Sequence, residues 1–442
     1  MSTEKNNPLH KVLGLGFGIA ILIGGTIGVG ILRAPGEIAG MLDNYWLIIG
    51  CWIAGGIYVL MGCGAYSELA TSIPKAGGSY NYIKRAFGEY AGFLSGWFDY
   101  ITNAIAPAIF CIVISEYIVI LFPSLKDQMT LIAIAFLVGF VLLHISGVKT
   151  GSIVQQITST IKVLFFVALI VACFMYSGVK IPNVQTDTTV MSTGFVIAFF
   201  KSLQMVLGTY DGWYAICFFA EEDENPSQNI PRSLFTGSII VILIYVLINM
   251  AYFYVLPIAS LANSPLVASD VAKVVFGESG STIVTVIAIF SIIGILNAYM
   301  MIPTRILFGL SRDGFFINAG QRVNSGGTPI VSLLISSIFS LILIIIGSFG
   351  ALMTLGAFLS VTVWCMTYFS LIKLRVSEPN LIRPYKTWGY PVTPVLLVLV
   401  SLGILFGFAY SDRQSLLVMV IVAVLSYPIF RLLKNKQAEE IN

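Results

Sequence analysis

The sequence predicts an all-α membrane protein, and three observations support that fold class. The chain has 442 residues, of which 57% are hydrophobic and only 10% are charged, whereas soluble domains are about half apolar and a quarter charged. Its mean hydropathy is +0.92. Its apolar runs are roughly 20 residues long, which suits membrane-spanning helices better than the shorter alternating strands of a membrane barrel.

Twelve apolar runs qualify as transmembrane helices. Short polar joints such as KDQM and RVNSGGTP separate them, so we expect residues 1–442 to form one transmembrane domain with no separate soluble part. The first run is too long for the apolar core of a cleavable signal peptide. The predicted spans cover residues 12–35, 45–70, 91–121, 129–147, 154–176, 194–220, 233–256, 281–305, 329–346, 351–372, 392–410 and 414–432.

The distribution of positive charge predicts the orientation of these spans. An even number of spans places both termini on one side, and a cytoplasmic placement puts most of the 24 Lys and Arg residues in cytoplasmic segments, as the positive-inside rule requires. Residues 74–90, PKAGGSYNYIKRAFGEY, are basic, amphipathic and rich in tyrosine, which predicts an interfacial helix or, alternatively, a plain loop. Residues 257–281 are expected to hold short helices over an outer vestibule.

The first span contains GGTIGVG, Gly24 to Gly30, in the middle of an apolar run. Glycine weakens a helix by about 1 kcal/mol relative to alanine, and unpaired backbone groups find no water inside a bilayer. Five spans later, LGTYDGW at residues 207–213 again places two glycines at mid-span, here beside Asp211. Interrupted helices at corresponding positions of two halves indicate a transporter's binding site, while a packing face for a neighbouring helix is the alternative.

A pair of broken helices has a specific chemical use. Each break exposes amide N–H groups at the start of one half-helix and carbonyl groups at the end of the other, with opposite partial charges. A free amino acid carries one carboxylate, which suits the amides, and one ammonium, which suits the carbonyls. We therefore interpret the two breaks as a substrate site for a small zwitterion.

Five segments resemble the amino acid–polyamine–organocation superfamily, in particular its L-type amino acid transporters. They occur in the family's order along nearly the whole chain. The segments are GTIGVGILRAP, PKAGGSYNYIKRAFGEYAGFLSGW, YDGW followed by AEEDENPSQNIPRSL, LNAYMMIPTRILFGLSRDGFF, and RPYKTWGYPVTP.

The resemblance implies the LeuT-type fold, with two inverted five-span repeats (12–177 and 194–373) and two additional helices (392–433), and with the first and sixth spans broken at mid-membrane. It implies that the amides of Val29 and Gly30 face the substrate carboxylate, and that the carbonyl of Ile27 and one near Gly208 face its ammonium. The substrate-binding residues expected on this basis are Ile27, Gly28, Val29, Gly30, Gly208, Thr209 and Tyr210.

Lys162 is the cation predicted to matter most, because a lysine within a span costs about 3 kcal/mol on insertion scales. It either extends its side chain to the cytoplasmic surface or, as the resemblance implies, its ammonium replaces a sodium ion against the first span, which implies sodium-independent transport. Whether it also carries a proton stays open. Asp211 is expected to hydrogen-bond the broken backbone or shape a gate, with cationic substrate selection or proton transfer as alternatives.

The chain also departs from the family pattern. Val29 stands where relatives carry serine, and Gly208-Thr209-Tyr210 replaces their Phe-Ala-Tyr, so the aromatic lid is absent unless Tyr210 or Trp213 replaces it. We have no account of Arg33 from the sequence. The six cysteines all lie in apolar runs without CxxC spacing, which is typical of buried hydrophobic side chains.

These observations predict a secondary amino acid transporter of the plasma membrane, and first an exchanger of neutral L-amino acids. Proton-coupled symport and antiport of cationic amino acids or polyamines are the alternatives. A membrane enzyme is disfavoured, because the chain has two histidines and no HExxH or GxSxG motif. A channel is disfavoured because the sequence shows no filter motif. A sensor that does not transport is not excluded by the sequence. We expect no cofactor, metal ion or nucleic acid partner. The loop FPSLKDQM has no cysteine, so we expect no covalently linked subunit.

Overall fold

The computed structural model describes residues 9–177, 193–264, 266–346, 349–411 and 413–441. Within these ranges the chain is helical, and its only β contacts are two isolated bridges. The α-helices are α1 (Leu15–Thr26), α2 (Gly30–Met41), α3 (Tyr45–Ser72), α4 (Ser79–Phe87), α5 (Glu89–Leu121), α6 (Met129–Ile145), α7 (Val148–Met175), α8 (Thr193–Tyr210), α9 (Pro226–Val255), α10 (Ile258–Ala262), α11 (Val267–Phe276), α12 (Ser279–Arg312), α13 (Ile330–Ile346), α14 (Phe349–Ser377), α15 (Val392–Ser411) and α16 (Arg413–Ile441). Three 3₁₀ turns join them: η1 (Pro123–Gln128), η2 (Ala215–Phe219) and η3 (Asn318–Gln321).

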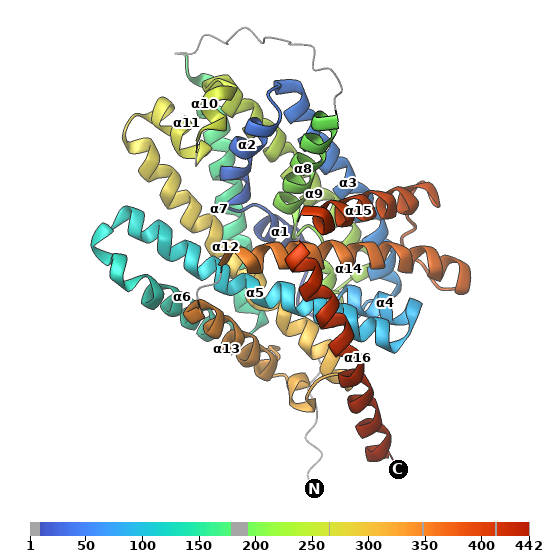
Figure 1. Cartoon of the computed structure of the whole chain (residues 1–442). Helices are drawn as coiled ribbons and strands as arrows, with labels where there is room; N and C mark the ends of the chain where they lie inside the picture. Colours follow the sequence, from blue (N-terminus) through green and yellow to red (C-terminus); the bar gives the residue numbers. More distant parts are fainter. Residues whose placement is uncertain (1–8, 178–192, 265, 347–348, 412, 442) are drawn as a thin grey trace.

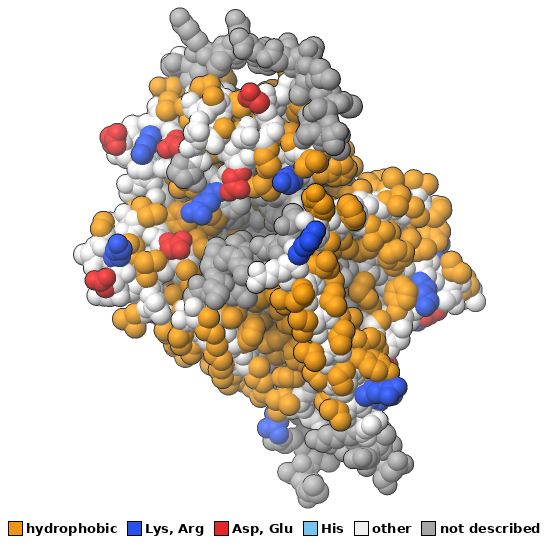
Figure 2. All heavy atoms as spheres, viewed as in Figure 1, with side chains coloured by type: hydrophobic (Ala, Val, Ile, Leu, Met, Phe, Trp, Pro, Cys, Tyr) orange, Lys and Arg blue, Asp and Glu red, His pale blue; other side chains and the backbone are white. Residues whose placement is uncertain are grey.

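The helices confirm a multi-pass membrane protein. Among the described residues, nine helices are long and apolar enough to cross a bilayer, and the bent pair α1 and α2 is a tenth candidate. Hydrophobic side chains cover most of the surface over α13 and α16 in Figure 2. Helix α13 is apolar but has only 17 residues, and α8 is not among the nine. The number twelve therefore stays a prediction.

Two long helices form the centre of the bundle. Helix α5 has 33 residues and α12 has 34, so each is roughly 50 Å long and exceeds the hydrocarbon thickness of a bilayer, about 30 Å. They pack along one another, and α1 and α7 pack against α12. In the most apolar part of α12, two-thirds of the residues are buried. Helix α12 therefore supports both α1 and α7.

The segments expected to be short helices are helical. Residues 79–87 form α4, and its residues Ser79 to Ile83 are buried where α4 packs on α5 and α14. The protein thus covers much of this helix, and its position at a membrane surface stays a prediction. Helices α10 and α11 occupy the joint predicted over residues 257–281 and lie beside α2 (Figure 1).

Candidate functional site

The first apolar run forms two helices that are separated within the glycine-rich segment. Helix α1 ends at Thr26, helix α2 begins at Gly30, and the two axes differ by 44°. The N-cap of α2 is Val29, whose side chain makes no capping hydrogen bond, so the first amides of α2 are available to a ligand. Gly30 is exposed and Val29 is partly exposed. An anion could therefore reach this helix start.

Lys162 is bound to the other side of the break. Its ammonium, at Nζ, donates hydrogen bonds to the carbonyl oxygens of Gly24, at 3.0 Å, and Ile27, at 2.6 Å. The hydroxyl of Ser291 on α12 donates to the same Ile27 oxygen at 3.1 Å. Only 2% of Lys162 is exposed, so its ammonium lies at the carbonyl end of α1, whose partial negative charge favours it, and does not extend to the surface of the protein.

One face of α7 binds α1 over about two turns. Gln155 and Ser159 both donate to the carbonyl oxygen of Ala20, at 3.3 and 2.8 Å, and Lys162 follows three residues later. Asn297 of α12 donates to the side-chain oxygen of Gln155 at 2.6 Å. Positions 155, 159 and 162 share one helix face, which is a pattern that the sequence could have revealed.

A second interruption follows α8. The helix ends at Tyr210, turns occupy residues 211–214, and η2 begins at Ala215. Gly212 has φ +95°, and a Cβ there would lie 2.6 Å from the carbonyl oxygen of Gly25. Only glycine permits this backbone conformation and this approach. The carboxylate of Asp211 accepts a hydrogen bond from the Gly212 amide at 2.7 Å.

Tyr245 of α9 connects the two interruptions. Its hydroxyl lies 2.9 Å from the carbonyl oxygen of Thr26 and 3.0 Å from that of Thr209. Thr26 is the last residue of α1, and Thr209 is one residue before the end of α8. The Tyr245 side chain is fully buried. The sequence analysis missed this residue, because nothing in a tyrosine within an apolar run shows which backbone it will reach.

The expected substrate-binding residues divide into two groups. Gly30 and Gly208 are exposed; a Cβ on Gly30 would lie 3.0 Å from Thr209, whereas one on Gly208 would meet nothing within 4 Å. Gly28 is buried, and a Cβ there would lie 2.3 Å from Ile295. The carbonyl of Ile27, expected to face the ligand, instead accepts from Lys162 and Ser291.

The two candidate lid aromatics are packed in the protein. Tyr210 is 1% exposed, and its hydroxyl donates to the carbonyl of Trp52 on α3 at 3.2 Å. Trp213 is also 1% exposed and packs against Tyr66, with ring centroids 4.9 Å apart, and against Trp364. In this conformation both rings support the second interruption from the side of α3.

Two further charged groups lie near the interruptions. Asp99 of α5 is fully buried near Asp211, and its Oδ2 has no hydrogen-bond partner within the described ranges. Arg33 lies near Glu116 and Tyr117 of α5, which gives this arginine charged and polar surroundings. Across the described residues, no group of three or more His, Cys, Asp or Glu could hold a metal ion, and all six cysteines are buried and unbridged.

Three ion pairs link segments that are distant in the sequence. Arg305 of α12 makes two hydrogen bonds to Glu222, at 2.8 and 2.9 Å, and both side chains are buried. Arg375 pairs with Glu68 at 2.6 Å, and Arg312 pairs with Glu221 at 2.8 Å. These residues come from segments expected at the cytoplasmic side. These pairs join α12 to the segment that follows η2, and α14 to α3, while Gly30 and Gly208 are exposed.

A buried cation lies at the carbonyl end of α1, and amides that no side chain caps lie across the interruption, which is an arrangement suited to binding a small charged molecule. A model of the amino acid permease family matches residues 17–429. The chain belongs to that family.

Individual relatives agree with the family. The chain is 28% identical to the serine/threonine exchanger SteT of Bacillus subtilis (strain 168), over 99% of this chain and 100% of that protein. It is 29% identical to the b(0,+)-type amino acid transporter 1 of Mus musculus, over 97% of this chain and 89% of the relative. It is 27% identical to the large neutral amino acids transporter small subunit 2 of Homo sapiens, over 86% of this chain and 72% of that protein.

Proposed function

We propose that this amino acid transporter is a sodium-independent exchanger that works by alternating access. The bonds from Lys162 to the carbonyls of Gly24 and Ile27 carry the proposal. An ammonium there supplies permanently the positive charge that a sodium ion would otherwise bring to the end of α1. With no cation to bind or release, the transport cycle has no sodium gradient to use, and exchange of one amino acid for another is the simplest reaction left.

The same proposal includes the membrane architecture. Twelve spans form two inverted repeats, 12–177 and 194–373, followed by two helices over 392–433, in a LeuT-type arrangement. The interruptions after Thr26 and Tyr210 and their contact at Gly25 and Gly212 support it. The positive charge of the joints supports cytoplasmic termini in the plasma membrane.

In the proposed site the substrate carboxylate binds the amides of Val29 and Gly30 at the uncapped start of α2. Its ammonium faces carbonyls near Gly208, because the Ile27 oxygen already accepts two hydrogen bonds. The open space beside Gly208 receives the substrate side chain, with Thr209 and Tyr210 forming the adjoining wall. Asp211 and Trp213 hold the turn that must rearrange when the gate opens.

Neutral L-amino acids are the proposed substrates. The carboxylate and ammonium are matched by backbone groups, and two relatives are named for serine and threonine or for large neutral amino acids. One observation favours a second candidate, transport of cationic amino acids or coupling to protons. The unpaired oxygen of the buried Asp99 lies near the partly buried Asp211, and two neighbouring carboxylates favour a cation or a shared proton.

The test is uptake into proteoliposomes that contain the purified chain alone. Radiolabelled amino acids and polyamines are supplied with or without unlabelled substrate inside, without sodium and at two pH gradients. Uptake that needs internal neutral amino acid supports the exchanger and shows that no covalently linked subunit is required. Uptake into empty liposomes that follows the proton gradient would replace it with a symporter, and flux that needs sodium would contradict the role of Lys162.

A further inference from the structure

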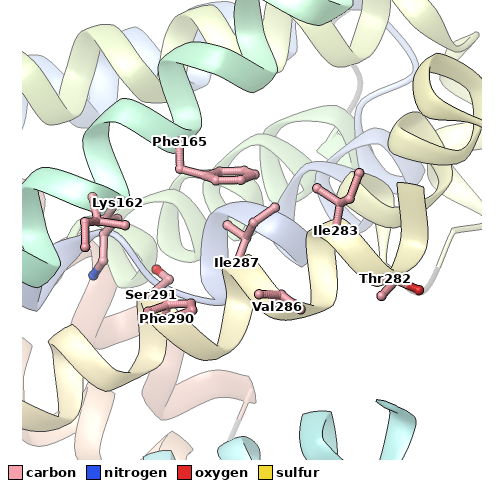
Figure 3. A pocket seen from close by; sticks show the side chains of 9 residues that line it. Lys162, Phe165, Thr282, Ile283, Val286, Ile287, Phe290 and Ser291 are labelled. Carbon is pink, nitrogen blue, oxygen red and sulfur yellow. The ribbon is translucent and has the colours of Figure 1, made fainter. Parts of the chain in front are cut away.

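A groove lies between α7 and α12 (Figure 3). Its volume is about 380 Å³. The side chains that line it are Ile161, Lys162, Phe165, Thr282, Ile283, Val286, Ile287, Phe290 and Ser291. Several of these apolar side chains, including Ile161, Ile283 and Phe290, are more than one-third exposed, so the groove opens towards the bilayer.

The groove has a direction and a length. Its α12 residues fall at 282–283, 286–287 and 290–291, a stripe that repeats every four residues along one helix face. The stripe begins three residues after the start of α12 at Ser279 and ends at Ser291, roughly 14 Å further along the axis. This distance matches half of a bilayer hydrocarbon core, about 15 Å.

Among the residues that line the groove, Lys162 is the one that can carry a charge, and it lies at one end of the groove, which we call the inner end. Lys162 and Ser291 line it there, and both donate to the Ile27 carbonyl at the end of α1. The remaining lining is apolar apart from Thr282 at the opposite end. The groove therefore runs from the level where α12 begins to the helix break, and it offers an occupant van der Waals contact along most of its length.

We propose that this groove binds a single acyl chain of a membrane phospholipid from the leaflet in which α12 begins. No hydrophobic driving force distinguishes protein from lipid inside a bilayer, so selective binding depends on packing. An unfilled groove loses dispersion contacts along its whole wall, and a flexible chain one leaflet long fills it. The terminal methyl group then lies beside Lys162 and Ser291, next to the carbonyl end of α1.

Photolabelling tests this assignment directly. The full chain is reconstituted with phosphatidylcholine that carries a diazirine either at the end or at the middle of one acyl chain, and adducts are mapped by peptide mass spectrometry. We expect the end label near Ser291 and the middle label near Val286, each several-fold above the exposed face of α16. Val286→Trp fills the groove and should lower both yields several-fold. Leu164→Trp is the matched control, since Leu164 is 64% exposed on α7 outside the groove.

A second variant guards against misfolding of the first. Phe290→Ala enlarges the groove and should raise labelling, with the elution profile and thermal denaturation temperature of each variant measured in parallel. Equal labelling in the wild type, Val286→Trp and Leu164→Trp would overturn the site. Displacement of the label by a sterol, with no displacement by excess unlabelled phospholipid, would overturn the acyl chain as its occupant. Labelling needs no transport, so these results do not depend on the proposed exchange reaction.

Discussion

Replacing Lys162 with alanine removes two charge-assisted hydrogen bonds from the end of α1. Each bond of this kind contributes about 1.5–3 kcal/mol, so the pair contributes roughly 3–6 kcal/mol before the cost of burying the ammonium is deducted. We take about 3 kcal/mol as the net loss to the conformation described here. At 1.36 kcal/mol per tenfold change, exchange by Lys162→Ala should fall about 100-fold.

The assay is exchange of a radiolabelled substrate across proteoliposomes, in choline chloride and in sodium chloride. Lys201→Ala is the matched control, because Lys201 is an exposed lysine on α8. If the ammonium replaces a cation, sodium should restore part of the activity of Lys162→Ala and leave the wild type unchanged. A folded Lys162→Ala protein that exchanges at the wild-type rate in both salts would refute the reasoning.

Three other substitutions test the remaining parts of the site. Gly208→Leu should abolish substrate binding, measured in a scintillation proximity assay, while the protein stays folded, because a Cβ there meets nothing within 4 Å. The control is Gly403→Leu, at an equally open position on α15, which should bind substrate normally. Unchanged affinity in Gly208→Leu would show that the substrate binds elsewhere. Tyr245→Phe should cost about 1–3 kcal/mol of stability and reduce exchange roughly tenfold. The control is Tyr252→Phe on the same helix, because the Tyr252 hydroxyl has no partner among the described residues; it should behave as wild type in thermal denaturation and exchange. Equal effects of the two substitutions would contradict the connecting role of Tyr245. Arg305→Met should destabilise the protein by about 3–5 kcal/mol because it leaves Glu222 buried without its partner. The double variant with Glu222→Met should recover most of the loss in melting temperature. A double variant that melts as low as Arg305→Met would show that the unpaired charge of Glu222 is not the cause of the loss.

The break in the first span could be predicted because its cause is local. Glycines weaken a helix wherever they stand, and α1 ends at Thr26 inside the predicted segment. The contact of Lys162 with the first span followed from the family resemblance, and the structure shows its two hydrogen bonds. Its role as a replacement for sodium stays a prediction.

Other parts of the site depend on tertiary packing and could not be read from the chain. The hydroxyl of Ser291 reaches Ile27 only because α12 crosses α1 at that level. Helix α8 ends at Tyr210, inside the interruption predicted at residues 207–213, but the close approach of Gly212 to the carbonyl of Gly25 could not be predicted from the sequence. Apolar periodicity alone describes neither event.

The hydroxyl of Tyr245 has one proton and faces two carbonyl oxygens, those of Thr26 and Thr209. At any moment it can donate fully to one of them, so the two broken helices compete for a single donor. When either helix end moves away, the hydroxyl keeps a full hydrogen bond to the other, and only the carbonyl that moves away loses its donor. Separation of the two interruptions therefore leaves the Tyr245 donor satisfied, and its polar cost falls on one carbonyl oxygen.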